Sequence, residues 1–294
     1  MKNSNLLVSG ASGQSGTLIV KALAARQQPI RALVRSRTNA SFLADLPNVD
    51  VTVGDMLEKD SLKAALDGID RAILLSSANE SMVETQCSFI DACKKAGVGH
   101  VIKFSGEEAQ RGYDPYHFRF TREHEQIEDY LENSGMSWTH LRPSQFMQVY
   151  LREAPTIIQN GELRLSLGEI SMSPVDLCDV AQVAAELLQK GGHHGKSLRM
   201  TGPEALKMAD IAAIFSSIAG KPVSYVQVSW EERRNFLVSA GFPLYLIDAL
   251  AEQAAERCRN PEGIVDLDTH RLFDIAPTSF EAFASAHAFI FGKA

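Results

Sequence analysis

The sequence predicts an α/β protein built on a Rossmann-type, doubly wound parallel sheet, with a smaller α/β region in its C-terminal half. Two observations carry this prediction: short β-rich runs alternate with helical patterns over the first half, and glycines form a tight corner after the first run. Several helical stretches also stop at a glycine, which commonly ends a helix. Repeated strand, helix, strand specifies a parallel sheet covered by helices on both faces.

The expected strands follow one another in a regular order. The β-rich runs are residues 5–9, 29–35, 49–54, 70–76, 100–105 and 137–143. The stretches between them place apolar residues at helical spacing, as in GTLIVKALAAR, SLKAALDG, SMVETQCSFIDACKKAGV and TREHEQIEDYLENSG. A run such as AILLS is continuously apolar, as expected for a strand that is buried on both faces.

The regular alternation of strand and helix patterns ends near residue 150. We therefore expect a dinucleotide-binding Rossmann domain over residues 1–150 and a smaller, mainly helical substrate-binding region over 151–294. The two regions are expected to pack directly on each other, with some exchange of segments. Residues 173–191 predict a helix with Asp176 or Asp179 near its N-terminus, where a carboxylate caps free amides. The remaining patterns predict strand–helix–strand over 197–229, two helices divided at Gly241–Pro243, and a short amphipathic helix over 279–291.

Composition excludes several classes of partner. The 294-residue chain has a formal net charge of −7 and no run of five basic residues, which argues against nucleic acid and acidic membranes. The four cysteines form no CxxC pair and match no zinc pattern, so we expect free thiols, no metal and a cytoplasmic location. We also expect no signal peptide and no membrane span, because no suitable apolar run is present. Oligomerisation is left open.

Gly10, Gly13 and Gly16 form a GxxGxxG motif directly after the first strand and at the start of a helix. Gly10 permits a tight turn, Gly13 permits close approach of the backbone to a pyrophosphate, and Gly16 permits close packing of helix on strand. Free amides of the first helical turn favour phosphate binding. The polar side chains on this turn that can add hydrogen bonds are Ser12, Gln14 and Ser15. The alternative, a sharp turn with no ligand, is disfavoured by this strand–turn–helix context.

The end of the second strand indicates which dinucleotide binds. An NAD site usually has Asp or Glu about 20 residues after the glycines, whereas this chain has Arg35, Ser36 and Arg37. A guanidinium group binds a 2′-phosphate, which a carboxylate would repel. The sequence therefore favours NADP(H), although Arg35 as an ordinary surface cation is the alternative.

In these features the chain resembles the NmrA-like branch of the atypical short-chain dehydrogenase/reductase family, and within it the bacterial NADPH-dependent quinone and triphenylmethane dye reductases. The matching segments, in order, are SGASGQSG, RALVRS, VTVGD, LLSS, HVIKFSG, SGMSWTHLRPSQFM and VSWEERRNFLVSAGFP. The resemblance implies a cofactor at the carboxyl ends of the strands. It places Asp55 and Met56 near the adenine and Ser76, Ser77 and Ala78 beside the ribose or nicotinamide. It also places Ser105, Gly106 and Pro143, with Ser144, next to the nicotinamide and substrate.

The usual proton-transfer pair of the superfamily, Tyr-x-x-x-Lys, is missing. Tyr113 and Tyr116 are followed four residues later by His117 and Phe120. The resemblance instead points to His124 as a catalytic residue, with Glu128 one helical turn away on the same face. A carboxylate there is expected to orient the imidazole and to raise its pKa. The alternative is a surface ion pair on a polar helix.

Aromatic side chains suggest where a flat substrate binds. Tyr113 and His117, together with Tyr116 and Phe118, lie on a loop expected to cover the nicotinamide. Phe146, together with Met147 and Tyr150, forms either an apolar substrate wall or part of the core. Lys103 lies inside a strand and is expected to point to a face of the sheet. The adjacent His193 and His194 are interpreted as a solvated turn in preference to a metal tract.

Two functions follow as hypotheses. The first is an NADPH-dependent reductase that transfers hydride to a quinone or a related conjugated aromatic small molecule, without flavin or metal. The second is a non-catalytic NADP(H)-sensing regulator of the NmrA type, which needs only the glycine corner and Arg35. An isomerase or an ether-cleaving reductase is a third possibility, because pocket residues decide the substrate.

Overall fold

The computed structural model describes residues 5–109 and 111–291 of the chain. The described residues divide into two compact units. Unit 1 comprises the described part of Met1–Ala109, together with Arg122–Arg142 and Val180–Leu198. Unit 2 comprises the described parts of Gln110–Thr121 and Arg199–Ala294, together with Pro143–Asp179. The units therefore interleave along the sequence, and a functional boundary at residue 150 stays a prediction.

A seven-stranded sheet forms the centre of unit 1, with the strand order β3-β2-β1-β4-β5-β6-β9. The strands are β1 (Leu6–Val8), β2 (Ile30–Val34), β3 (Val49–Val53), β4 (Arg71–Leu74), β5 (His100–Phe104), β6 (Ser137–Pro143) and β9 (Lys196–Met200). The pairs from β3 to β6 are parallel, and β9 follows β6 in the same direction. The order reverses at β1, as in doubly wound dinucleotide-binding folds. The expected α/β Rossmann-type fold is confirmed.

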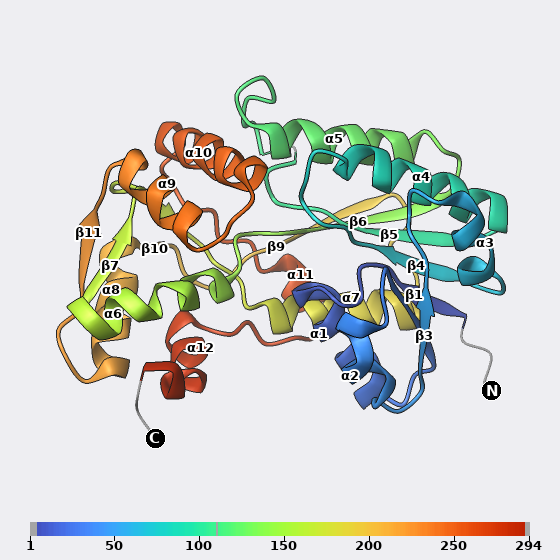
Figure 1. Ribbon diagram of the computed structural model, residues 1–294, viewed down its shortest axis with the longest axis horizontal. Helices are drawn as coiled ribbons and strands as arrows, with labels where there is room; N and C mark the ends of the chain where they lie inside the picture. Colours follow the sequence, from blue (N-terminus) through green and yellow to red (C-terminus); the bar gives the residue numbers. More distant parts are fainter. Residues whose placement is uncertain (1–4, 110, 292–294) are drawn as a thin grey trace. The chain divides into compact units, whose positions relative to one another are not determined.

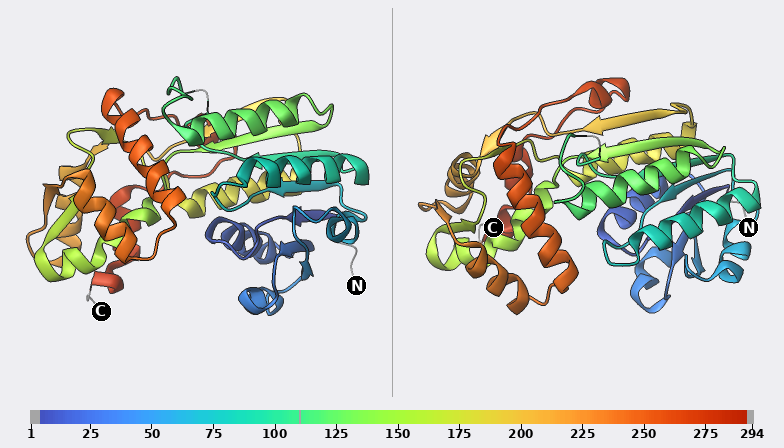
Figure 2. Two further views of the ribbon diagram at one scale, coloured as in Figure 1. Left: turned by 45° about the horizontal axis from the view of Figure 1, so that its top comes forward. Right: turned by 90° about the horizontal axis from the view of Figure 1, so that it is seen from above.

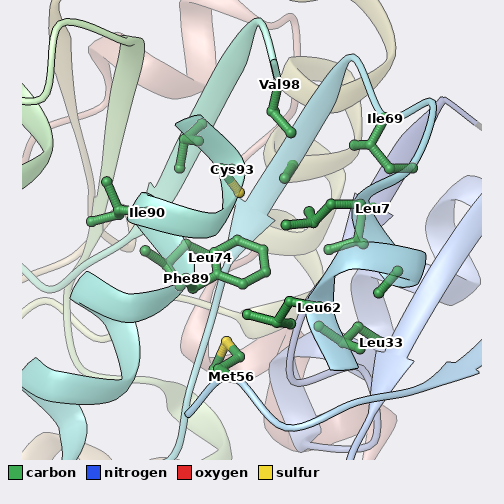
Figure 3. Close-up of a cluster of buried hydrophobic side chains, with 14 of the residues drawn as sticks. Leu7, Leu33, Met56, Leu62, Ile69, Leu74, Phe89, Ile90, Cys93 and Val98 are labelled. Carbon is green, nitrogen blue, oxygen red and sulfur yellow. The ribbon is translucent and has the colours of Figure 1, made fainter. Parts of the chain in front are cut away.

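Helices cover both faces of this sheet (Figures 1 and 2). The helices are α1 (Gln14–Ala25), α2 (Ser41–Ala44), α3 (Lys59–Leu66), α4 (Met82–Ala96), α5 (Arg119–Glu132) and α7 (Leu177–Lys190), with the 3-10 helix η1 (Thr38–Ala40). Helices α3, α4 and α5 pack on one face, and Figure 3 shows part of their shared cluster, in which Phe89 lies near Leu74. On the other face, an ion pair to Glu186 of α7 is made by Arg26, the residue that follows the C-terminal end of α1.

Unit 2 is a smaller assembly of helices and short strands. Its helices are α6 (Ala154–Asn160), α8 (Met208–Ala219), α9 (Trp230–Ser239), α10 (Leu244–Arg259), α11 (Asp268–Leu272) and α12 (Phe280–Ala286), with the 3-10 helices η2 (Met147–Glu153) and η3 (Ala288–Phe291). Its strands are β7 (Glu162–Leu165), β8 (Ser171–Met172), β10 (Leu206–Lys207) and β11 (Ser224–Gln227), which form the pairs β11–β7 and β10–β8. Its core includes Tyr150, Phe215 and Phe280.

Local sequence explains where several elements end. Gly97, Gly161 and Gly220 take left-handed backbone conformations directly after α4, α6 and α8, where glycine carries no steric penalty. Asp176 accepts a hydrogen bond from the Cys178 amide just before α7, at one of the two predicted capping positions. Within the described residues, none of the helices has both the length and the apolar character needed to cross a bilayer.

Candidate functional site

The glycine corner joins β1 to α1 at the carboxyl end of the sheet. Gly10 has a φ of +56°, a left-handed conformation that L side chains rarely adopt. A Cβ on Gly16 would lie 2.3 Å from the Gly10 carbonyl oxygen, so only glycine fits this position without a backbone shift. Gly13 is the N-cap of α1 in an extended conformation, and no acidic residue follows it in the first turn. The corner therefore presents backbone amides and the positive end of α1 to solvent.

Hydrogen bonds hold this corner from two sides. The Ser9 amide donates to the Ile73 carbonyl of β4, and two residues later the Ala11 amide donates to the Leu33 carbonyl of β2. The Ser9 hydroxyl donates to the Leu75 carbonyl and accepts from the Leu75 amide, at 2.8 Å in each case. Ser12 and Gln14 are exposed on the same turn, and Ser15 is partly exposed. Their side chains are thus available to a ligand that reaches the amides.

The two arginines after β2 have different surroundings. Arg35 is exposed directly beyond the strand. The Arg37 guanidinium donates to the Val51 carbonyl at 3.1 Å, which binds it to β3. The Arg37 side chain therefore contributes to local structure, and Arg35 is the better candidate for a phosphate ligand.

The residues expected near the adenine follow β3. The Asp55 carboxylate accepts from the Leu57 amide at 2.9 Å, and the Ser61 hydroxyl donates to the Asp55 carbonyl. These bonds shape the turn that leads into α3. The Met56 side chain is buried in the cluster beside Leu33 and Leu62 (Figure 3). Contact of Asp55 and Met56 with adenine stays a prediction.

A side chain of α4 holds the segment that follows β4. The Gln86 amide nitrogen donates to the Ser76 hydroxyl at 2.9 Å, and Gln86 itself is buried. Ser77 and Ala78 follow as exposed residues. Because a buried amide holds Ser76, this segment has a defined position next to the glycine corner, to which Ser9 also connects it through Leu75.

The β5 end carries an acidic residue that the sequence interpretation did not select. Ser105 is buried, and its amide donates to the Leu141 carbonyl of β6. Beyond it, a Cβ on Gly106 would lie 2.5 Å from the carboxylate of Glu108. The Glu108 side chain therefore folds back against Gly106, over the end of the strand.

His124 lies between Glu108 and a buried lysine. Its Nδ1 is 3.0 Å from the Nζ of Lys103, and its Nε2 is 3.6 Å from Oε1 of Glu108. The expected rise in the pKa of His124 is wrong: burial, followed by the positive charges of Lys103 and Arg142, lowers this pKa well below its ordinary value. The imidazole is therefore neutral near pH 7.

Glu128 does not pair with His124 as expected, but contacts Arg142 instead. The Glu128 carboxylate accepts two hydrogen bonds from the Arg142 guanidinium, at 3.0 and 2.5 Å, and both residues are buried. Burial alone would raise the pKa of Glu128, but the Arg142 hydrogen bond and neighbouring positive charges outweigh it and lower this pKa. Glu128 acts as the partner of Arg142, and a catalytic role for either His124 or Glu128 stays a prediction.

Lys103 is the functional candidate that sequence reasoning undervalued. Its side chain is fully buried on the sheet face, as expected, but that face is the one against which His124 of α5 lies. Burial lowers the pKa of Lys103 to about 8, although the carboxylates of Glu128 and Glu108 oppose this effect. The available signal was a lysine between the apolar Ile102 and Phe104 in a predicted strand, because a buried charge requires partners.

The expected substrate residues all belong to unit 2. Pro143 ends β6 as a buried residue. Phe146 is partly exposed and forms a parallel bridge with Val175. Met147 and Tyr150, in contrast, are buried in the unit 2 core, so of the two interpretations given for them the core is correct.

The aromatic loop is divided between core and surface. Tyr113 is 5% exposed and packs with Phe118 and Phe120. His117 is exposed, with Nδ1 2.6 Å from a carboxylate oxygen of Asp114, and Tyr116 is 90% exposed. Substrate contact by Tyr113, His117 and Phe146 remains a prediction.

Among residues 5–109 and 111–291, no group of three or more His, Cys, Asp or Glu side chains has a geometry that could hold a metal ion. His193 adopts a positive φ, and the rings of His194 and His100 meet in a T-shaped arrangement at the amino end of β5. These histidines therefore lie at the opposite end of β5 from Lys103.

An α/β fold with a glycine corner after β1 and an arginine after β2 defines a dinucleotide-binding protein. Comparisons with known proteins identify its family. The chain belongs to the NmrA-like family, whose model matches residues 2–284. It is 35% identical over 291 residues to an NAD(P)H azoreductase of Xenophilus azovorans, covering 98% of this chain and 100% of the relative.

Two solved structures have similar folds. The NADPH-dependent quinone oxidoreductase of Escherichia coli in complex with NADPH has a TM-score of 0.85 at 26% identity, covering 97% of this chain and 99% of that chain. The triphenylmethane reductase of Citrobacter sp. in complex with NADP(H) has a TM-score of 0.82 at 25% identity, covering 96% of this chain and 99% of that chain. The expected family is confirmed.

Proposed function

We propose that this protein reduces a quinone, an azo compound or a related conjugated aromatic molecule with hydride from NADPH. The broader expectation, an NAD(P)H-dependent oxidoreductase that uses NADP(H), is confirmed by the relatives named as azoreductase and quinone oxidoreductase and by neighbours solved with NADP(H). The observation that carries the proposal is the glycine corner, whose geometry requires Gly10 and Gly16, followed by the exposed Arg35 where NAD enzymes have a carboxylate.

The corner fits the pyrophosphate of a dinucleotide. The amides of Ser12, Gln14, Ser15 and Gly16 would bind the phosphates, because they are at the positive end of α1 and no acidic side chain in its first turn opposes them. Arg35 would bind the 2′-phosphate as a charge-assisted pair. The other proposed cofactor contacts are those that the family resemblance assigned, namely Asp55, Met56, Ser76, Ser77, Ala78, Ser105, Gly106 and Pro143.

When bound, NADPH would supply hydride, and the protein would supply position and one proton. A quinone or an azo group becomes an anion on oxygen or nitrogen when it accepts hydride, so the site must deliver a proton to that atom. His124 is the proposed proton donor, and the missing Tyr-x-x-x-Lys pair is tolerable because these acceptors are already electron-poor. Tyr113, His117 and Phe146 are proposed to contact the substrate.

The non-catalytic sensor is not favoured. The structure of the negative transcriptional regulator NmrA in complex with NADP has a TM-score of 0.80 at 18% identity, which supports a shared fold alone. The azoreductase, at 35% identity over 98% of this chain, and a quinone oxidoreductase of Escherichia coli, at 29% identity over 84% of this chain, are more similar in sequence.

The proposal is tested by following NADPH and NADH oxidation with a panel of acceptors: a quinone, an azo dye, a triphenylmethane dye and a simple ketone. We expect turnover of NADPH with the quinone or the azo dye, and little with the ketone. Protein that binds NADPH but reduces none of the conjugated acceptors would overturn the proposed substrate class.

A further inference from the structure

Lys103 occupies an unusual place for a cation. It lies in β5, its side chain is fully buried, and the residues on either side of it, Ile102 and Phe104, are apolar. An ammonium group costs considerable free energy in such surroundings unless neighbouring groups compensate. Glu128, the buried carboxylate whose charge favours the ammonium form of Lys103 most, already accepts two hydrogen bonds from Arg142. Charge balance for Glu128 therefore does not by itself explain the presence of Lys103.

The contacts of Lys103 form a path from the interior to the surface. Its Nζ lies 3.0 Å from His124 Nδ1, and His124 Nε2 lies 3.6 Å from Oε1 of Glu108. Lys103 is fully buried, whereas the side chains of His124 and Glu108 are each 13% exposed. An ammonium group only donates hydrogen bonds, so Nδ1 accepts and the imidazole proton is on Nε2. The three groups are thus arranged so that protons can pass between the buried amine and the partly exposed carboxylate through the imidazole.

We propose that Lys103, His124 and Glu108 form a proton relay that supplies the proton consumed in each reduction. This inference rests on the proposed function. Lys103 acts through His124, so it is a proton source and a positioning residue, while His124 is the group that meets the substrate.

The transfer balances as follows. Hydride addition leaves a negative charge on a substrate oxygen or nitrogen atom. The Nε2–H bond of His124 breaks as an O–H or N–H bond forms on the product, and an N–H bond of Lys103 breaks as an Nδ1–H bond forms. Lys103 is then a neutral amine, and the imidazole is in its other tautomer. The substrate has gained one hydride and one proton.

Glu108 restores the starting state. A proton from water enters through its partly exposed carboxylate to His124 Nε2, and the Nδ1 proton returns to Lys103. Gly106 makes this arrangement possible, because a Cβ at that position would lie 2.5 Å from the Glu108 carboxylate. The absence of a side chain at Gly106 therefore leaves room for the Glu108 carboxylate in this position.

The electrostatics of Lys103 suit this role. Burial lowers the pKa of Lys103 to about 8, near enough to neutrality that the amine can lose and regain a proton in each cycle. His124 has its pKa lowered and does not retain the proton. The charged and titratable groups facing Lys103 come from α4, α5, β6 and the loop after β5, and they are Cys87, His124, Glu128, Arg142 and Glu108.

The first test measures protonation directly and needs no turnover. Protein labelled with ¹⁵N at histidine is titrated by NMR without cofactor, and His124 is assigned with a His124→Gln variant. We expect a His124 with its proton on Nε2 near neutrality, and an inflection of its ring nitrogens near pH 8 as Lys103 loses its proton. Lys103→Met should remove this inflection. A His124 that titrates alone near pH 6.5, equally in both proteins, would overturn the relay.

The second test measures catalysis with three lysine variants. Lys103→Met is expected to lower kcat by about 100-fold with KM for NADPH unchanged, and to remove the decline in rate at alkaline pH. Lys103→Arg retains the positive charge but does not release a proton, so it should not restore the rate. Lys94→Met is the control, because Lys94 donates to the Ser134 carbonyl at the surface of unit 1. Full activity of Lys103→Arg would overturn the proposal.

Glu108→Gln provides a third measurement on a partly exposed residue whose replacement is less disruptive. It should leave the first turnover fast and slow the following ones, giving a burst in rapid-mixing experiments. A proportional loss in all turnovers would contradict the resetting role. Wild-type protein that shows the coupled His124 titration but reduces no acceptor would instead disprove the proposed function and leave the Lys103–His124 coupling intact.

Discussion

The two edges of the central sheet in unit 1 use polar residues in different ways. At the amino edge, the Arg71 guanidinium donates to the Leu188 and Gln189 carbonyls at the end of α7. His100, at the start of β5, hydrogen-bonds the Thr139 hydroxyl, which donates to the His193 carbonyl. These side chains satisfy backbone groups, so the amino edge stabilises the fold.

At the carboxyl edge, the polar groups point to one another or to solvent. The corner after β1 exposes amides of α1, and three strand positions further along β5 from His100 the side chain of Lys103 contacts His124. The same strand thus carries a neutral imidazole at one end and a titratable ammonium at the other. The difference teaches that burial alone does not distinguish a structural polar residue from a functional one, whereas its partners do.

Replacing one glycine near each edge by alanine should give the largest contrast, which is a contrast in NADPH affinity. In Gly16→Ala, the new Cβ would lie 2.3 Å from a backbone oxygen, so the corner must shift. We expect NADPH affinity to fall by about 100-fold or more, equivalent to about 3 kcal/mol. In the control Gly99→Ala at the amino edge, the Cβ would make an ordinary 3.4 Å contact with the Asp70 carbonyl. Fluorescence titration with NADPH should show no change for Gly99→Ala, and equal losses in both variants would contradict the contrast.

Arg35→Ala should reduce cofactor discrimination. Loss of a charge-assisted pair to the 2′-phosphate is expected to weaken NADPH binding by about 2 kcal/mol and to leave NADH binding nearly unchanged. The measurement is the ratio of dissociation constants for the two cofactors. Arg37→Ala is the matched comparison, because its guanidinium is bound to the Val51 carbonyl. A larger change of the ratio in Arg37→Ala would reassign the phosphate ligand.

His100 should make the amino edge sensitive to acid. Burial, with the nearby charges of His194 and Arg71, lowers the pKa of His100 from 6.5 to about 4. The unfolded chain therefore binds this proton at a higher pH than the folded chain, and stability falls as the pH drops through this window. We expect His100 to contribute about 2 kcal/mol of the loss between pH 7 and pH 5.

Urea unfolding of wild type and His100→Gln at both pH values measures this contribution. Part of the acid loss should persist in the variant, because the pKa values of His124 and His140 are also lowered by burial. An identical pH dependence in the two proteins would show that His100 does not control acid stability.

Arg71→Ala is expected to have the smallest effect. It removes hydrogen bonds from a partly buried guanidinium to the end of α7 and should lower the free energy of unfolding by about 1 kcal/mol. Activity per folded molecule should be unchanged, since the contact lies at the amino edge. Urea unfolding with an activity assay checks both parts, and Lys21→Ala on the exposed surface of α1 is the control.

The strands and the glycine corner were predictable because their signals are local. The run 137–143 coincides with β6, and the run 100–105 differs from β5 by one residue at its end. The partners of His124 were not predictable in the same way. They depend on how α5 is set against β5 and β6, which decides that His124 meets Lys103 and that Glu128 meets Arg142. A spacing of four residues places His124 and Glu128 on the same face of α5, but it does not show which residues of the sheet that face contacts.

The hydrogen bonds of the Ser9 hydroxyl have a consequence for the affinity of the corner for its ligand. Because it accepts from and donates to Leu75, while flanking amides bond to β4 and then to β2, the loop is preorganised before any nucleotide arrives. Little conformational entropy remains to be lost on association, so affinity is not reduced by an ordering cost. Amide exchange at Ala11 and Leu75 should accordingly be slow in the free protein and change little when NADPH binds.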